Sequence, residues 1–223
     1  MESGKLRNNK KKTQAQPGPA LFGLGLGFIG LSLIALLAIF YPTISNEIKY
    51  RFSPPDSEAE VVLTQVKNSE EEKKYIVAAD PFFSIVIPKI GANAKVIKDV
   101  DAQDSKVYQK ALTEGVAHAK NTALPGQVGN TFLFAHSSDN FVAANRYNSI
   151  FYLLNKLEEG DEIFLIFNRR KYIYEVKETK VVSPEEISYL DSKSDAPKVT
   201  LMTCWPAGTT LKRLVVVAEL QPR

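Results

Sequence analysis

The chain has 223 residues, of which 44% are hydrophobic, so it is long enough for one domain of about 140 residues with further segments attached. Its single cysteine excludes an internal disulfide and a four-cysteine zinc site, and with only two histidines we expect no metal site. Five Lys and Arg residues face one Glu within residues 1–18, which leaves 23 basic and 24 acidic residues elsewhere. This balance argues against a nucleic-acid-binding domain, which needs clustered positive charge.

The N-terminal region predicts a membrane anchor. Residues 1–19 form a basic tail, and residues 20–41 (ALFGLGLGFIGLSLIALLAIFY) are 22 residues without a charge. A helix of that length crosses a hydrocarbon core of about 30 Å. The main alternative is a cleaved signal peptide, but its apolar region is only about 7 to 15 residues long. We therefore expect a single transmembrane helix at 20–41, with the tail in the cytoplasm by the positive-inside rule and the rest outside the membrane.

Residues 42–80 are predicted to be an extracytoplasmic stalk or linker. The run SPPDS at 53–57 interrupts regular structure, and the acidic, mixed sequence after it favours a partly disordered or weakly helical segment, with a short helix expected around 58–67. The folded domain is expected to span residues 81–223.

The folded domain reads as short strands separated by turns. Residues 171–180 (KYIYEVKETK), for example, alternate apolar and polar side chains as a half-solvated strand does. The expected strands are 83–87, 94–97, 130–136, 162–167, 171–182, 198–203 and 213–220, and the expected helical segments are 105–113, 150–157 and 184–190. About eight short strands with a few short helices predict an all-β barrel or sandwich.

Three chemically active side chains are expected at strand ends. Cys204 follows the strand at 198–203, His136 ends the strand at 130–136, and Arg213 opens the last strand. Pairing of the last two strands would bring Arg213 back toward Cys204. A neighbouring imidazole or guanidinium favours the thiolate, histidine can carry protons to and from an amine, and arginine can donate to an oxyanion. The three residues are therefore a candidate acyl-transfer site.

Each of these residues also has a simpler interpretation. A free cysteine is most often an inert, buried apolar residue. His136 could be a hydrogen-bonded core histidine, and Arg213 could be a surface residue. The other histidine, His118, falls in a loop-like stretch and is expected to be structural or groove-lining. No glycine-rich phosphate loop or HExxH motif is present, so we expect no cofactor.

These stretches together resemble the sortases, membrane-anchored cysteine transpeptidases. Residues 200–204 (TLMTC) match the sortase signature TLxTC, and Pro206, Gly208 and Arg213 after it resemble sortases of class D and E. The similarity covers residues 82–220. It includes the stretches 84–91 (SIVIPKIG), 113–126 (TEGVAHAKNTALPG), 130–136 (NTFLFAH) and 152–161. Many sortases have Gly-His-Arg or Gly-His-Thr where this chain has Ala135-His136-Ser137, a difference that bears on the sorting signal.

The resemblance implies a closed eight-stranded barrel preceded by one transmembrane helix. It implies Cys204 as the nucleophile, His136 as the acid and base, and Arg213 as the residue that holds the substrate backbone or the oxyanion. The implied substrate is a surface protein with a C-terminal LPxTG-like sorting signal, and the acceptor is an amine of a cell-wall precursor or a pilin lysine. Two alternatives stay open at this point: an anchored barrel that binds peptide or wall polymer without catalysis, and a thiol protease that releases the acyl group to water.

Overall fold

The structure is a computed structural model that describes residues 19–57, 59–63, 75–137, 150–190 and 194–222. The chain divides into two compact units, Met1–Pro42 and Thr43–Arg223. The helix α1 (Pro19–Phe52) contains the predicted segment 20–41. Across the described residues, no helix combines the length and the sustained apolar character that crossing a bilayer requires.

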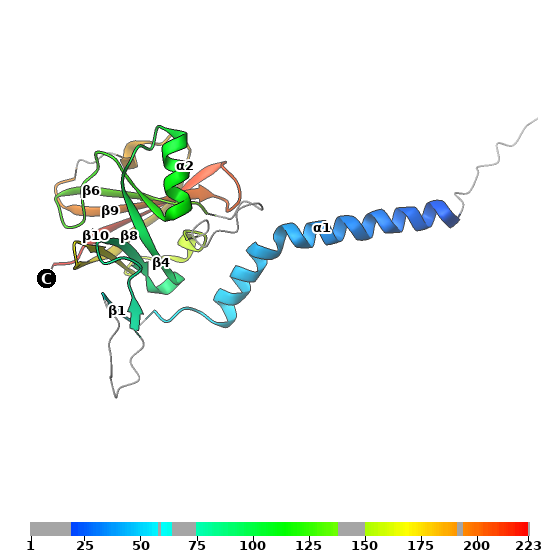
Figure 1. The fold of residues 1–223 in the computed structure, drawn as a ribbon, viewed down its shortest axis with the longest axis horizontal. Coiled ribbons are helices and arrows are strands. Elements are labelled where there is room, and N and C mark those ends of the chain that lie inside the picture. The colour runs from blue at the N-terminus through cyan, green and yellow to red at the C-terminus, as the bar shows by residue number, and fades with distance from the viewer. Residues whose placement is uncertain (1–18, 58, 64–74, 138–149, 191–193, 223) are drawn as a thin grey trace, which may run out of the picture. The chain divides into compact units, whose positions relative to one another are not determined.

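The second unit is built on a closed barrel of eight strands in the order β10-β8-β7-β3-β4-β5-β6-β9. Figure 1 shows β6, β9, β10 and β8 of this barrel side by side. Neighbours pair antiparallel except β4 with β5 and β6 with β9, which are parallel. The strands are β3 (Phe83–Ile87), β4 (Ala92–Val100), β5 (Val116–Ala119), β6 (Gly129–Phe134), β7 (Glu162–Phe167), β8 (Arg170–Val182), β9 (Pro197–Trp205) and β10 (Lys212–Leu220). The barrel predicted from the sequence is confirmed, and closure leaves it without a free edge strand.

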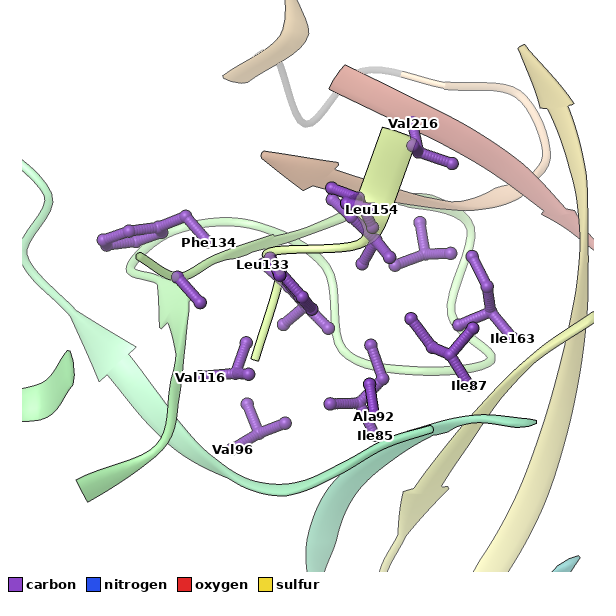
Figure 2. Packing of buried hydrophobic residues seen from close by; sticks show 14 of the residues in the cluster. Ile85, Ile87, Ala92, Val96, Val116, Leu133, Phe134, Leu154, Ile163 and Val216 are labelled. Atoms are coloured by element: carbon purple, nitrogen blue, oxygen red, sulfur yellow. The ribbon is translucent and has the colours of Figure 1, made fainter. Parts of the chain in front are cut away.

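Apolar side chains from all eight strands fill the barrel. Ile85, Ile87 and Ile163 are fully buried, and Figure 2 shows them pointing toward one another. In β9 and β10 the residues of the core alternate with residues on the outer face, as the two-residue period of a strand requires. The outer face of these two strands can therefore carry polar and reactive side chains.

Among the described residues after α1, helical structure is confined to short segments between strands. In the second unit α2 (Ser105–Glu114) links the parallel strands β4 and β5, and its N-cap Asp104 accepts hydrogen bonds from the backbone N–H groups of Lys106 and Val107. The remaining helices are single 3₁₀ turns: η1 (Pro88–Ile90), η2 (Leu154–Lys156) and η3 (Ser188–Leu190). The helices expected at 150–157 and 184–190 are thus shorter than the sequence predicts, because one 3₁₀ turn suffices to join two barrel strands.

Several strand boundaries differ from the sequence-based prediction. β4 is longer than 94–97, and β6 ends at Phe134, two residues before His136. β9 continues through Trp205, so Cys204 lies inside a strand, one residue before its end. The hairpin between β7 and β8 is confirmed, with Asn168 and Arg169 both at positive φ (49° and 61°) in a two-residue turn.

Two short strands lie on the outside of the barrel. β1 (Glu60–Val62) and β2 (Tyr75–Val77) pair in parallel. A second apolar cluster joins them to the outer faces of β3 and β7; its buried members are Val61, Ala78, Val86, Phe164 and Ile166. The helix expected around 58–67 is wrong for Glu60–Val62, because pairing with β2 and contact with the barrel outweigh the weak helical tendency of this acidic stretch.

Candidate active site

Arg213 lies directly opposite Cys204 across the antiparallel pair β9 and β10. The two residues flank an exposed connection, residues 206–211, and adjacent strands hold opposed residues on the same face of a sheet. Val199 and Leu201 of β9 belong to the core cluster, which places Cys204 and Arg213 on the outer face. Both side chains are partly exposed. The expected pairing of the last two strands is therefore present, and its register brings thiol and guanidinium to neighbouring positions.

His136 approaches Cys204 from the other side of β9. The parallel pair β6 and β9 aligns residues 68 apart in sequence, ending with Phe134 opposite Met202. The alignment continues past the end of β6, because the Ala135 N–H donates to the Met202 carbonyl (3.2 Å). The same offset brings His136 level with Cys204. Cys204 thus lies on β9, Arg213 lies on its neighbour β10, and His136 lies in the segment that follows its other neighbour, β6.

The two threonines of the TLMTC stretch tie β9 to the strand that leads to the histidine. The Thr203 hydroxyl donates to the Ala135 carbonyl (2.8 Å), and the Thr200 hydroxyl donates to Asn130 Oδ1 (2.9 Å). Both threonines are buried. Neither threonine is predicted from the sequence to have a role in the site. Their signal is two small hydroxyl residues within a mostly apolar strand, a pattern that requires nearby acceptors.

The Arg213 guanidinium is fixed by the connection beside it. Its Nη1 donates to the carbonyls of Thr210 (3.1 Å) and Lys212 (3.0 Å). A carboxylate lies within its electrostatic reach: the pKa of Glu185 is lowered, first by a hydrogen bond from Ser183 and further by the charge of Arg213. A guanidinium has five N–H donors, so others remain for a substrate carbonyl or an oxyanion.

The remaining sequence-predicted features lie elsewhere. His118 is fully buried in β5, rather than in a loop, with Nε2 near the Ala123 carbonyl (3.2 Å) and the Phe83 ring packed against it. Of the polar run after His136, Ser137 is buried, and the residues that follow it lie outside the described part of the chain. Among the described residues, no group of three or more His, Cys, Asp and Glu side chains could hold a metal ion.

A family model described as the sortase domain matches residues 85–221. The chain belongs to the sortase family. Sortase D of Bacillus subtilis (strain 168) is 26% identical over 161 residues, 69% of this chain and 73% of that protein. Sortase A of Listeria monocytogenes is 28% identical over 200 residues, 85% of this chain and 87% of that protein.

The fold agrees with solved sortase structures. The structure of a sortase D5 transpeptidase from Clostridium perfringens is similar with a TM-score of 0.52 and 28% identity, covering 66% of this chain and 82% of that chain. Sortases are cysteine transpeptidases, and this chain is a transpeptidase of the sortase kind.

Proposed function

We propose that this sortase is of the class D or E type and cleaves an LPxTG-like sorting signal with Cys204, His136 and Arg213. The observation that carries the proposal is the register across β9. Arg213 is paired with Cys204 on one side, and the β6 alignment brings His136 level with Cys204 on the other. Cys204 would thus have an acid–base group, His136, on one side and a fixed positive charge, Arg213, on the other.

The first half of the reaction forms a thioester. The Cys204 thiolate attacks the carbonyl carbon of the signal's threonine, and the carbonyl oxygen takes the negative charge of the tetrahedral intermediate. The C–N bond then breaks as protonated His136 gives its proton to the leaving amine. The C-terminal fragment departs, and the acyl group stays on Cys204.

The second half transfers the acyl group to an amine. Neutral His136 takes a proton from the incoming amine as its nitrogen attacks the thioester carbonyl. The C–S bond breaks, an amide forms, and Cys204 and His136 return to their starting protonation states. In both halves Arg213 donates to the developing oxyanion or to the adjacent substrate backbone, which lowers the barrier because the donor is already fixed by Thr210 and Lys212.

The proposed partners are surface proteins with a C-terminal sorting signal and an acceptor amine from a cell-wall precursor or a pilin lysine. Sortases act on substrates of this kind and are typically anchored in the membrane at the cell surface. For this chain we place the anchor at 20–41, a segment with no charged residue. The described apolar side chains of α1 between Leu26 and Leu37 are exposed, as those of a lipid-facing helix would be. The N-terminus would be cytoplasmic and the barrel extracytoplasmic.

A peptide-exchange experiment tests the proposal. The purified protein is incubated with LPxTG-like peptides, with and without an added primary amine, and the products are analysed by mass spectrometry. We expect an acyl adduct on Cys204 and an exchanged amide when the amine is present. Cys204→Ala should abolish both, whereas Glu114→Gln, an exposed residue at the end of α2 whose side chain has no part in the scheme, should retain both. Cleavage that persists in Cys204→Ala would overturn the assignment, and release to water despite excess amine would indicate a protease.

A further inference from the structure

A pocket of about 570 Å³ opens on the same outer face of β9 as Cys204. Its floor is formed by Lys198 and Thr200 of β9 together with the residues opposite them in β10, Glu219 and Val217. Glu178 of β8 lies opposite Val217 and extends the lining. The β9 and β10 positions belong to the strands that carry Cys204 and Arg213.

Buried hydrogen bonds hold the pocket in shape. Asn130 of β6 accepts from the Thr200 hydroxyl through Oδ1 (2.9 Å) and donates through Nδ2 to the Tyr189 carbonyl of η3 (2.9 Å). Asn130 and Thr200 are 6% and 2% exposed. The side chain of Asn130 therefore joins the floor to the turn that borders the pocket, and the space between them is defined before any ligand binds.

The separation between pocket and thiol corresponds to a whole number of peptide residues. Thr200 precedes Cys204 by four residues in one strand, about 13 Å at a rise of about 3.3 Å per residue. An extended peptide alongside β9 advances by the same rise. When the carbonyl of one of its residues is at Cys204, the side chain four residues away is at the pocket. For a signal of the form LPxT before the cleaved bond, this is the residue immediately preceding the motif.

The part of the substrate before the cleaved bond, which becomes the acyl group, is the part that would run from Cys204 toward the pocket. Beyond Cys204 the strand ends at Trp205 and is followed by a connection with exposed residues at 206, 208, 210 and 211. The leaving fragment must depart, and an amine must enter, through an open side of that kind. The acyl half must stay bound through both half-reactions, which suits the side with a preformed pocket.

The charges of the pocket favour a cation. Its lining includes three carboxylates, those of Glu178, Asp195 and Glu219, against one ammonium, that of Lys198. Lys198 is 3.3 Å from Glu219, and the Lys180 ammonium pairs with Glu178, so two of the three negative charges are offset and one remains. We propose that this pocket takes a basic side chain at the residue directly before the sorting motif and so contributes to substrate choice. The inference rests on the proposed function, because the pocket is placed relative to acyl transfer at Cys204.

The test compares three peptides that differ only at the residue before the motif, which is Lys, Gln or Glu. The peptide series is built on a signal that the protein cleaves in the exchange assay. Because Glu178 and Glu219 are partly exposed, we expect kcat/KM to fall about two- to fivefold from Lys to Gln and again from Gln to Glu. The change should lie mainly in KM and should weaken with added salt.

A matched pair of variants assigns the effect to the pocket. The double substitution Glu178→Gln and Glu219→Gln should remove most of the preference for Lys, measured as the ratio of kcat/KM for the Lys peptide to that for the Gln peptide. Glu114→Gln, which removes one charge at the end of α2, should leave the preference unchanged. Equal kcat/KM for the three peptides, or a preference that survives in the double variant, would overturn this inference and leave acyl transfer intact. Absence of cleavage for every peptide would instead overturn the proposed function and this inference with it.

Discussion

Arg213 shows how one side chain can serve both the fold and the reaction. Its hydrogen bonds to Thr210 and Lys212 fix the connection after β9, and the pairing with Cys204 fixes its position beside the thiol. A lysine at this position would keep the charge but not the planar arrangement of five donors.

We therefore expect Arg213→Ala to lower kcat/KM for a sorting peptide by about 10² to 10³, the range seen when an oxyanion donor is removed. Arg213→Lys should fall between this variant and the wild type. Steady-state kinetics measures the effect, and a thermal melt checks that the barrel is intact. If Arg213→Ala stays within twofold of the wild type, Arg213 does not act on the reacting carbonyl.

His118 has a structural environment that requires the neutral form. Its Nδ1 accepts from the Asp99 N–H (3.3 Å), so the proton is on Nε2, which donates to the Ala123 carbonyl. Complete burial lowers the pKa of His118, an effect reinforced by the charge of Lys98 and opposed by the Ala123 hydrogen bond and by the Asp99 carboxylate, whose Oδ1 is 3.7 Å away. The histidine is therefore a core residue that titrates below the usual range.

This environment predicts that stability falls in mild acid. An unfolded histidine binds its proton near pH 6.5, and the folded one only at lower pH, so the unfolded state holds more protons between the two pKa values. The free energy of unfolding should therefore drop as the pH falls through about 6.5, measured by urea denaturation between pH 8 and pH 5.5. His118→Gln should flatten this dependence, and His136→Gln should retain it. The opposite pattern would assign the effect to His136.

At the scale of elements, the site depends on how β9 is joined to the segment after β6. Backbone pairing of these strands ends near Phe134, and the Thr203 hydroxyl continues the connection through the Ala135 carbonyl. This hydrogen bond is buried and lies one residue from both Cys204 and His136. Its loss should affect the geometry of the site more than the stability of the barrel.

Thr203→Val tests this role, since it keeps the shape of the side chain and removes the hydroxyl. We expect a loss of about 1 to 2 kcal/mol in the free energy of unfolding, because the Ala135 carbonyl is left without this donor. We also expect kcat to fall by at least tenfold, because His136 is no longer held level with the thiol. Thr179→Val serves as the control. It removes the hydrogen bond that the hydroxyl of Thr179 in β8 donates to the Leu157 carbonyl, and activity should be unchanged. Equal activity of the two variants would show that Thr203 is not a positioning residue.

Local sequence patterns predicted the strands and helices with strong periodicity. They could not predict which distant strands pair. The strand at 83–87, the helix near 105–113 and the β7–β8 hairpin follow from spacing and turn residues within a few positions. The pairing of Arg213 with Cys204 was also predictable, because only eight residues separate them. The approach of His136 was not, since it depends on a parallel pairing between segments 68 residues apart, for which apolar periodicity carries no partner information. The resemblance to sortases, rather than the residue pattern, supplied that relation.

At the scale of the whole molecule, the folded region extends upstream of residue 81, where the sequence predicted its start. β1 and β2 cover Val86, Phe164 and Ile166 on the outer face of the barrel. The ring of Pro55 also lies close to Gly91, where an added Cβ would be 3.0 Å from the Pro55 Cγ. Residues assigned to a linker by their composition thus contribute to the packing of the barrel.

A truncation series should show this contribution. A protein that begins at residue 53 should keep the thermal midpoint of one that begins at residue 43, whereas one that begins at residue 80 should lose at least about 2 kcal/mol through exposure of the outer cluster. For a domain of this size, that loss corresponds to a decrease of roughly 4 to 8 °C. Val61→Ala in the longer protein should reproduce part of the decrease. Identical midpoints for the three proteins would mean that the outer cluster adds nothing to stability.

The parallel pairing of β6 with β9 also has a kinetic consequence. The β9–β10 hairpin closes a short loop, so Cys204 and Arg213 can meet early as the chain folds. The β6–β9 contact must close a loop of about 70 residues, and contacts of such sequence separation form slowly. During refolding of the full chain, the thiol would thus meet its arginine well before its histidine. A refolding chain would carry an incomplete set of catalytic groups until the barrel closes, and recovery of peptide cleavage would report the last stage of folding.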